Sequence, residues 1–370
     1  MLLILEIIAI VLCIVHFAIP LTYYAYMKKY LKNSWNIKIN ANYRPTITII
    51  IPTYNEAKTI QRKLINIQEQ NYPRELIETI IIDSASTDGT PTIIKRLIKI
   101  QENQRIKLIQ EKERKGKAYA LNNALKHATG EIIIVTDADA LWPQDALTEL
   151  VKWLSDPTVG AVSCLKRPIQ GEIITIEEGY RKYYNILRIA ESKAWSTPIF
   201  HGELAAYKKH LLRKIEGFPT DIGADDSYTA TRIALLGCRT ITPETLWCYE
   251  MIPKKGYHTW RIRRAQHLIQ HFTKTLKIKP SANPAFKKIL AVEAYLHIMN
   301  PWLLIAATLI LMISIIYTRN ILPAMFLVTG LILLLFKPFR TWIATQLYLT
   351  LAMIRNLWTK DLMWRKQLKT

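Results

Sequence analysis

Two aspartates, Asp137 and Asp139, stand one residue apart directly after the apolar run at residues 131–135. The run predicts a buried strand, and ligands of open α/β sheets bind just outside the carboxyl ends of such strands. Paired carboxylates are the oxygen ligands that a hard divalent cation prefers, and this cation usually arrives with a phosphate. A lone Asp-x-Asp is equally compatible with an acidic turn, so the neighbouring clusters must decide between the two.

Three further polar clusters accompany predicted strands. Strands are predicted at residues 46–51, 77–83, 105–110 and 131–136, and helices at 56–70, 91–101, 117–129 and 143–154. This alternation predicts βαβ units and a mostly parallel sheet. The clusters are Pro52-x-Tyr54-Asn55-Glu56, the segment from Asp83 to Thr90, and Arg114-Lys115-Gly116-Lys117. Together they offer an aromatic face, carboxylates and cations, which suit the base, ribose and diphosphate of a nucleotide.

From about residue 45 to residue 270 the chain resembles the family 2 glycosyltransferases, the inverting GT-A enzymes that include cellulose and hyaluronan synthases and dolichol-phosphate sugar synthases. The four clusters match, in order, the family's opening motif, its second acidic motif, its basic loop and its metal motif. The resemblance implies an α/β GT-A domain. It implies nucleotide contacts from Pro52, Tyr54, Asn55, Glu56, Asp83, Asp88, Lys117 and Asp137, and a Mn²⁺ or Mg²⁺ ion at Asp139 and Asp137.

A second pair of acidic residues, Asp225 and Asp226, precedes a helix predicted at residues 227–236. The pair could simply cap this helix. The resemblance implies instead that Asp226 is the base that deprotonates the acceptor hydroxyl, with Asp225 beside it. His201 and Gly202 fall in a segment similar to the one under the acceptor in the family, although a lone histidine is more often structural.

Processive polymer synthases of the family carry Gln-x-x-Arg-Trp, and the corresponding stretch here keeps only Arg263 of that motif. The departure favours transfer of a single sugar. Arg263 and Arg264 could meet a diphosphate or a lipid phosphate, and a role only at the membrane surface is the alternative. The stretch is amphipathic, so we expect Trp260, Leu268, Ile269 and Phe272 to dip into lipid.

The composition favours a membrane protein. Half of the 370 residues are hydrophobic, yet the net charge is +21. An anionic cytoplasmic membrane surface explains both properties, whereas nucleic-acid binding explains only the charge. The four cysteines are scattered and contain no C-x-x-C pair, which argues against a disulfide framework or a zinc site.

The apolar segments predict a multi-pass protein of the cell membrane. Residues 1–30 read as an uncleaved anchor with Met1 outside, because lysines follow it at once and a small-residue cleavage site is missing. The expected order continues with a cytoplasmic GT-A domain at 40–255, amphipathic interfacial helices at 256–300, and a transmembrane hairpin at 301–337. Residues 338–370 form an interfacial or fourth transmembrane helix and a basic tail.

The sequence therefore predicts an inverting, metal-dependent glycosyltransferase that moves one sugar from a GDP- or UDP-linked donor to a lipid-linked acceptor at the cytoplasmic face of the membrane. Mannose from GDP-mannose is the donor that the resemblance favours. A processive polysaccharide synthase is the first alternative. A non-catalytic nucleotide-binding membrane protein is a second one, and it would have no use for both Asp139 and Asp226.

Overall fold

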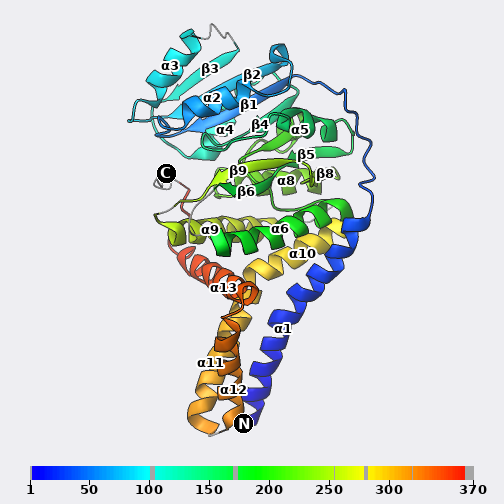
Figure 1. Ribbon diagram of the computed structural model, residues 1–370, viewed down its shortest axis with the longest axis vertical. Helices are drawn as coiled ribbons and strands as arrows, with labels where there is room; N and C mark the ends of the chain where they lie inside the picture. Colours follow the sequence, from blue (N-terminus) through cyan, green and yellow to red (C-terminus); the bar gives the residue numbers. More distant parts are fainter. Residues whose placement is uncertain are drawn as a thin grey trace.

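The computed structural model describes residues 2–100, 105–169, 174–253, 255–278, 282–318 and 320–362. Figure 1 shows a head built around a β-sheet, a layer of helices below it, and a narrow helical stalk with the N-terminus at its tip. Met1 and residues 363–370, which include most of the expected basic tail, lie outside the described residues.

The head is built on a seven-stranded sheet in the order β3-β2-β1-β4-β7-β5-β8. Strand β7 runs antiparallel to both of its neighbours, β4 and β5, and the other pairs are parallel. A second sheet pairs β6 with β9 in parallel. The strands are β1 (Ile47–Thr53), β2 (Ile77–Ser84), β3 (Ile106–Glu111), β4 (Ile132–Val135), β5 (Val159–Ser163), β6 (Leu165–Ile169), β7 (Ala205–Lys208), β8 (Arg239–Ile241) and β9 (Trp247–Met251). The first four confirm the predicted strands to within two residues.

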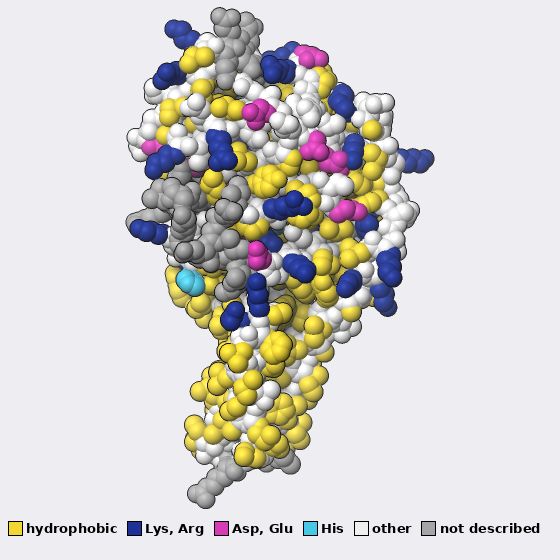
Figure 2. Space-filling view, viewed as in Figure 1, with side chains coloured by type: hydrophobic (Ala, Val, Ile, Leu, Met, Phe, Trp, Pro, Cys, Tyr) yellow, Lys and Arg dark blue, Asp and Glu magenta, His cyan; other side chains and the backbone are white. Residues whose placement is uncertain are grey.

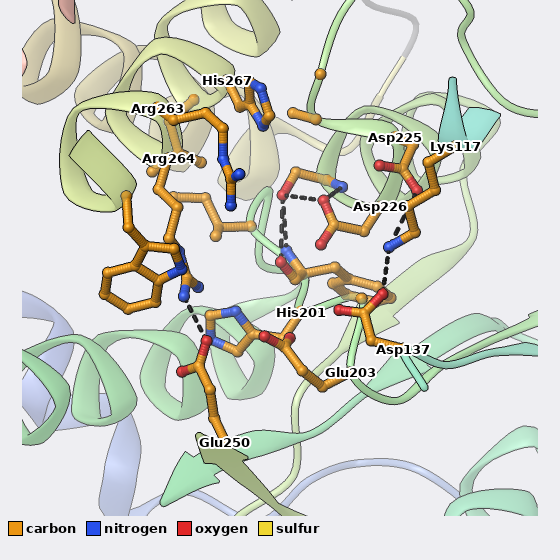
Figure 3. Close-up of a pocket in the computed structure, with 18 of the residues that line it drawn as sticks. Lys117, Asp137, His201, Glu203, Asp225, Asp226, Glu250, Arg263, Arg264 and His267 are labelled. Carbon is orange, nitrogen blue, oxygen red and sulfur yellow. Dashed lines mark hydrogen bonds and ion pairs between the residues drawn. The ribbon is translucent and has the colours of Figure 1, made fainter. Parts of the chain in front are cut away.

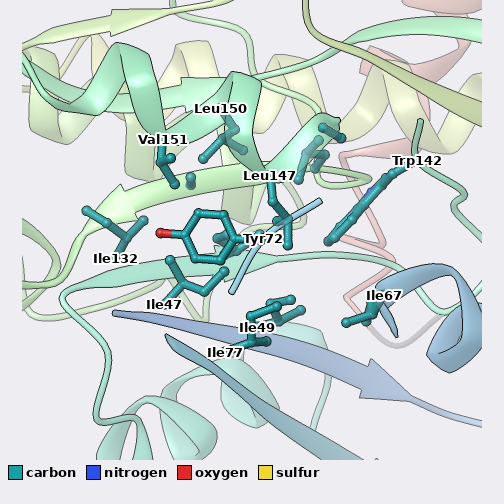
Figure 4. Close-up of a cluster of buried hydrophobic side chains, with 14 of the residues drawn as sticks. Ile47, Ile49, Ile67, Tyr72, Ile77, Ile132, Trp142, Leu147, Leu150 and Val151 are labelled. Atoms are coloured by element: carbon teal, nitrogen blue, oxygen red, sulfur yellow. The ribbon is translucent and has the colours of Figure 1, made fainter. Parts of the chain in front are cut away.

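Helices cover both faces of this sheet because its strands are apolar on both sides. Along β1, Ile47, Ile49 and Ile51 join one core cluster and Ile50 joins the other, as the alternation of side chains in a strand requires. Figure 4 shows the first cluster, where the buried Tyr72 hydroxyl donates to the Pro45 carbonyl at 2.6 Å. The helices of the head are α2 (Ile60–Gln68), α3 (Thr90–Ile100), α4 (Lys117–His127), α5 (Ala146–Leu154), α7 (Lys209–Lys214) and α8 (Asp225–Leu235), with a 3₁₀ turn at Arg74–Leu76.

A layer of four helices separates the head from the stalk: α6 (Ile174–Ala194), α9 (Tyr257–Thr275), α10 (Pro284–Ile298) and α13 (Lys337–Arg355) (Figure 1). The expectation that the apolar side chains of α9 dip into lipid is wrong. Trp260, Ile269 and Phe272 are at most 6% exposed, because α9 packs against α8, α10 and α13. An amphipathic pattern cannot distinguish a lipid surface from a protein surface as the partner of the apolar face.

The stalk consists of α1 (Leu2–Lys28), α11 (Asn300–Thr318) and α12 (Ile321–Leu333), and a 3₁₀ turn (Lys29–Lys32) links α1 to the head. Its surface is largely hydrophobic, whereas Lys and Arg gather over the head (Figure 2). Among the described residues, two helices are long and apolar enough to cross a membrane, Ile4–Lys32 and Pro284–Tyr317. Helices α12 and α13 meet at 107° and would add a third candidate only as one bent span.

Candidate active site

A cavity of about 280 Å³ lies between the carboxyl ends of the central strands and helices α6, α9 and α13. Most of the site residues expected from the sequence line it: Pro52, Tyr54, Glu56, Lys117, Asp137, Asp139, His201, Gly202, Asp225, Asp226, Arg263 and Arg264. Segments from residue 52 to residue 264 thus contribute to one space. Three expected site residues, Asn55, Asp83 and Asp88, are not part of its lining.

Asp83 and Asp88 organise the loops beside the cavity. The Asp83 carboxylate accepts hydrogen bonds from the Thr53 hydroxyl at 3.1 Å and from the Ser86 hydroxyl at 2.5 Å. Asp88 accepts from the backbone N–H groups of Thr90 and Ala57. Both carboxylates therefore hold the loops after β1 and β2 together, and direct nucleotide contact from them stays a prediction.

One end of the cavity offers an aromatic face with a cation beside it. Tyr54 follows β1, and the Arg114 guanidinium lies 3.9 Å from the centroid of its ring. The next residue, Asn55, has φ of 57°, a left-handed conformation that asparagine tolerates better than most residues. Its side-chain oxygen accepts from the Thr87 N–H at 2.8 Å. This geometry turns the chain sharply after β1 and leaves Tyr54 facing the cavity.

Two lysines, Lys117 and Lys63, hold the Asp137–Asp139 loop in place. The Lys117 ammonium lies 2.8 Å from Asp137 Oδ1. Beneath the loop, the fully buried Lys63 donates to the Ala140 carbonyl at 2.9 Å and lies 3.5 Å from the centroid of the Trp142 ring. Burial lowers the pKa of Lys63 to about 7. Burying a lysine costs desolvation free energy. Because Lys63 is buried in order to bond to this loop, we infer that the position of the loop is tightly determined.

The donor set at this loop fits a hard divalent cation. Asp137 and Asp139 supply carboxylate oxygens at the end of β4, and both line the cavity. Within the described part of the chain, no group of three or more His, Cys, Asp or Glu side chains is arranged to hold a metal ion. Further ligands would therefore be diphosphate oxygens and water, as is usual for Mg²⁺-type sites at nucleotides.

Asp225 and Asp226 form the first turn of α8 rather than its cap, because the cap residue is Ala224. Asp226 Oδ1 accepts from the N–H of Ser227 at 2.6 Å and from its hydroxyl at 3.2 Å, and the side chain points into the cavity (Figure 3). Asp225 turns toward Lys117, with 3.8 Å between its Oδ2 and Nζ. The predicted helix therefore begins two residues earlier than expected, and the two carboxylates have different environments.

The charges around Lys117 are strongly coupled. Burial raises the pKa of Asp225 to about 6; Lys117 opposes this shift and the Asp226 charge adds to it. Burial lowers the pKa of Lys117, but the charges of Asp137 and Asp225 outweigh this effect, so its pKa lies above the ordinary value. Lys117 is thus a cation that lies between the Asp137–Asp139 loop and the first turn of α8.

Gly202 allows the backbone to come close to these charged groups. A Cβ at this position would lie 3.0 Å from Lys117 Nζ and 3.3 Å from Asp226 Oδ2. The backbone N–H of the neighbouring His201 donates a hydrogen bond to the Ser163 hydroxyl at 3.0 Å. Burial and then the cations Lys166 and Arg181 hold the pKa of His201 well below its usual range. His201 is therefore neutral at pH 7.

A buried ionic network beside the cavity was not expected from the sequence. Its hub is Glu250 on β9, which is 3% exposed and accepts from Arg181 and Arg264 at 2.5 Å each. Lys166 on β6 lies 3.3 Å from Glu250 and also pairs with Glu203. The sequence did contain one indication of this network, namely the charged residues within the short strands β6 and β9. Charged side chains on strands in a protein interior are rarely left unpaired.

Arg263 and Arg264 face different parts of the cavity. Arg264 is paired with Glu250, and its guanidinium also lies 4.6 Å from the centroid of the Trp260 ring. Arg263 is 9% exposed, and burial and then the Arg264 charge lower its pKa to about 10, although the charges of Asp361 and Asp137 oppose the shift. Its side chain lies beside Arg264 and His267 on α9 (Figure 3).

The sequence pattern of glycosyl transferase family 2 matches residues 48–216. The chain is also similar to the mannosyltransferase PcManGT from Pyrobaculum calidifontis, a structure in complex with GDP-Man and Mn²⁺. The two are 53% identical, the match covers 96% of this chain and 100% of that one, and the TM-score is 0.90. This protein belongs to glycosyltransferase family 2 and is an enzyme with a GT-A fold.

Other relatives are more distant. A poly-beta-1,6-N-acetyl-D-glucosamine synthase of Staphylococcus aureus is 29% identical over 270 residues, which are 69% of this chain; the match spans only 64% of that relative's length. TarS of S. aureus is 18% identical with a TM-score of 0.50 over 67% of this chain and 42% of that one, and it shares the fold alone.

Proposed function

We propose that this enzyme is an inverting, metal-dependent mannosyltransferase that moves one mannose from GDP-mannose to a lipid-linked acceptor. The observation that carries the proposal is that a single cavity receives the Asp137–Asp139 loop and Asp226 from different elements. This is the pairing that a single displacement requires, with a metal site for the leaving diphosphate and a base for the acceptor. The choice of donor is supported by the full-length similarity to PcManGT.

The side chains of the cavity divide naturally between donor and acceptor. We assign base stacking to Tyr54, diphosphate contact to Lys117 and Arg263, and Mn²⁺ or Mg²⁺ to Asp139 with Asp137. The bound cation would supply positive charge to the departing diphosphate. Asp226 faces the cavity from the first turn of α8, where it would accept the proton of the incoming hydroxyl.

A calorimetric panel tests the choice of donor. GDP-mannose should bind more tightly than UDP-N-acetylglucosamine in the presence of Mn²⁺, and excess chelator should remove most of this binding. The similarity to a poly-N-acetylglucosamine synthase makes a processive synthase the second candidate. Preference for UDP-N-acetylglucosamine would favour that candidate and contradict GDP-mannose as the donor.

We further propose that α1, α11 and α12 cross the cell membrane, with the N-terminus outside and the head in the cytoplasm. The side chains of these helices support this, since Leu21, Ile316 and Leu331 are each at least 66% exposed although they are apolar. Helix α13 packs against α6 and α9 and contributes Tyr348 and Leu349 to the cavity wall. This favours an interfacial position for α13 over a fourth span.

Cysteine labelling of intact cells should reveal this topology. In a background with the four native cysteines replaced, Ile321→Cys at the tip of the stalk should react with a membrane-impermeant reagent; Ile321 is 69% exposed. Thr370→Cys should react only after the cells are permeabilised. Labelling of Thr370→Cys in intact cells would instead place the C-terminus outside and require a further span.

A further inference from the structure

Helix α9 holds the loop that precedes α8. Three of its side chains, His267, Gln270 and Lys274, are spaced three and four residues apart and so lie on one side of the helix. Lys274 pairs with Asp221 at the surface, Gln270 bonds to the backbone of Gly223, and the His267 ring lies against Gly223. Gly223 lines the cavity two residues before α8 begins. The end of this loop is therefore attached to α9 at the edge of the cavity.

The Gln270 amide is fixed by hydrogen bonds at both of its ends. Its Oε1 accepts from the backbone N–H of Gly223 at 2.9 Å, and its Nε2 donates to Asn356 Oδ1 at 2.9 Å and to the Lys360 carbonyl at 3.0 Å. A backbone N–H can only donate and a carbonyl can only accept, so these partners determine which way the amide points. Gln270 is 9% exposed. Loss of its Oε1 would deprive the Gly223 N–H of this partner.

The His267 ring limits the space beside Gly223. A Cβ on Gly223 would lie 2.2 Å from both Cδ2 and Nε2 of this ring, and the three nearest atoms all belong to His267. Gly223 does not have a positive φ, so alanine would meet the ring rather than backbone strain. Within the described part of the chain, His267 Nε2 has no hydrogen-bond partner. This edge of the ring therefore holds the loop by packing.

We propose that Gln270 and His267 are positioning residues for the catalytic base, because they fix the loop from which Asp226 enters the cavity. This inference rests on the proposed function, which gives the base role to Asp226. The Asp226 carboxylate is hydrogen-bonded to Ser227, the next residue on the same turn of α8. Those bonds move with the helix, so the place of the carboxylate in the cavity depends on the loop before it. A base acts only within hydrogen-bond reach of the proton that it takes.

Gly223→Ala tests the contact with His267. The added methyl group would push the loop and the ring apart, and a displacement of about 1 Å can cost about 10²-fold in rate. Turnover is followed as GDP release from GDP-mannose by the full-length enzyme with Mn²⁺, with octyl mannoside, polyprenyl monophosphate or water as the acceptor. It should fall by about that factor. Calorimetric affinity for GDP-mannose should not change, because the loop is distinct from Tyr54 and the Asp137–Asp139 loop.

The double variant Gly223→Ala/His267→Ala provides the rescue, since the smaller side chain makes room for the methyl group. It should recover most of the turnover that Gly223→Ala loses. Gly330→Ala is the matched control, because it is the same chemical change in α12 at a position where an added Cβ has open space around it. This control should release GDP at the rate of the unchanged enzyme.

Gln270→Met tests the hydrogen bond, whether or not Gly223→Ala folds. Methionine keeps the length of the side chain but offers no amide to Gly223. Hydrogen–deuterium exchange should become faster in the peptide that contains Gly223. Turnover should fall while the affinity for GDP-mannose is kept, a combination that general loss of stability would not produce. Unchanged exchange together with unchanged turnover would overturn the role of Gln270.

The outcomes separate this inference from the proposed function. Full turnover of Gly223→Ala would overturn it, and so would a loss that the double variant does not reverse. Donor binding that weakens in step with the rate would assign the loop to the donor instead. Full activity of Asp226→Asn would remove the base and the positioning role with it. If the unchanged enzyme does not bind GDP-mannose, the proposed donor is wrong, and the same variants are then compared with the nucleotide sugar that the calorimetric panel identifies.

Discussion

Asp226→Asn should slow mannosyl transfer by about 10²–10⁴-fold, which corresponds to about 3–5 kcal/mol in the activation free energy. The asparagine Oδ1 can still accept the two hydrogen bonds from Ser227, so the first turn of α8 keeps its geometry. The second carboxylate oxygen, Oδ2, which lies near Gly202, is replaced by an amide NH₂ group. This group cannot accept a proton from the acceptor. Calorimetric binding of the donor should change little, because the proposed role of Asp226 is toward the acceptor.

Asp225→Asn is the matched comparison for this experiment, since it removes the neighbouring carboxylate by the same chemical change. Asp225 turns toward Lys117 rather than into the centre of the cavity, so its loss should cost less than the loss of Asp226. A larger effect at Asp225 would assign the base to that residue. Full activity in both variants would mean that the two carboxylates only stabilise the start of α8.

Asp139→Ala should abolish metal-dependent binding of the nucleotide sugar and reduce transfer on the order of 10³-fold or more, since a cation at a leaving diphosphate contributes several kcal/mol. The fold should survive. Asp139 lies in a loop after β4, and the anchors of that loop are Lys63 and Trp142, which the substitution leaves in place. Calorimetry with Mn²⁺ and a thermal melt measure the two effects separately.

Asp145→Ala is the control for this substitution, because Asp145 is an exposed acidic residue a few positions along the same segment, at the start of α5. It should bind donor and metal as the unchanged enzyme does. The metal assignment fails if Asp139→Ala retains normal turnover, or if the unchanged enzyme remains fully active in excess chelator.

The parts of the fold that depend on local sequence could be predicted. The four strands from β1 to β4 are short runs rich in Ile, and each is followed by polar residues at its carboxyl end. Because parallel strands bring these ends to one edge, the clusters at Tyr54, Lys117 and Asp137 could be placed together without a structure. The structure adds that Asp83 supports the neighbouring loops from outside the cavity.

The parts that depend on distant partners could not be predicted. Glu250 meets Lys166 and Arg181, which lie 84 and 69 positions away in the chain. Each of these residues alone reads as an ordinary surface charge. The apolar face of α9 was assigned to lipid for the same reason, since helical periodicity shows that a face is buried but not what buries it.

The place of β7 in the sheet has a consequence for biogenesis. This strand lies between β4 and β5, so it joins the two halves of the sheet, yet it leaves the ribosome about 70 residues after β4. Until then the apolar β4 is an unpaired edge, the kind of surface on which nascent chains aggregate. The apolar α1 precedes β4 in the chain and therefore emerges before it. Early capture of α1 by the insertion machinery would hold each nascent chain apart from its neighbours while that edge is open.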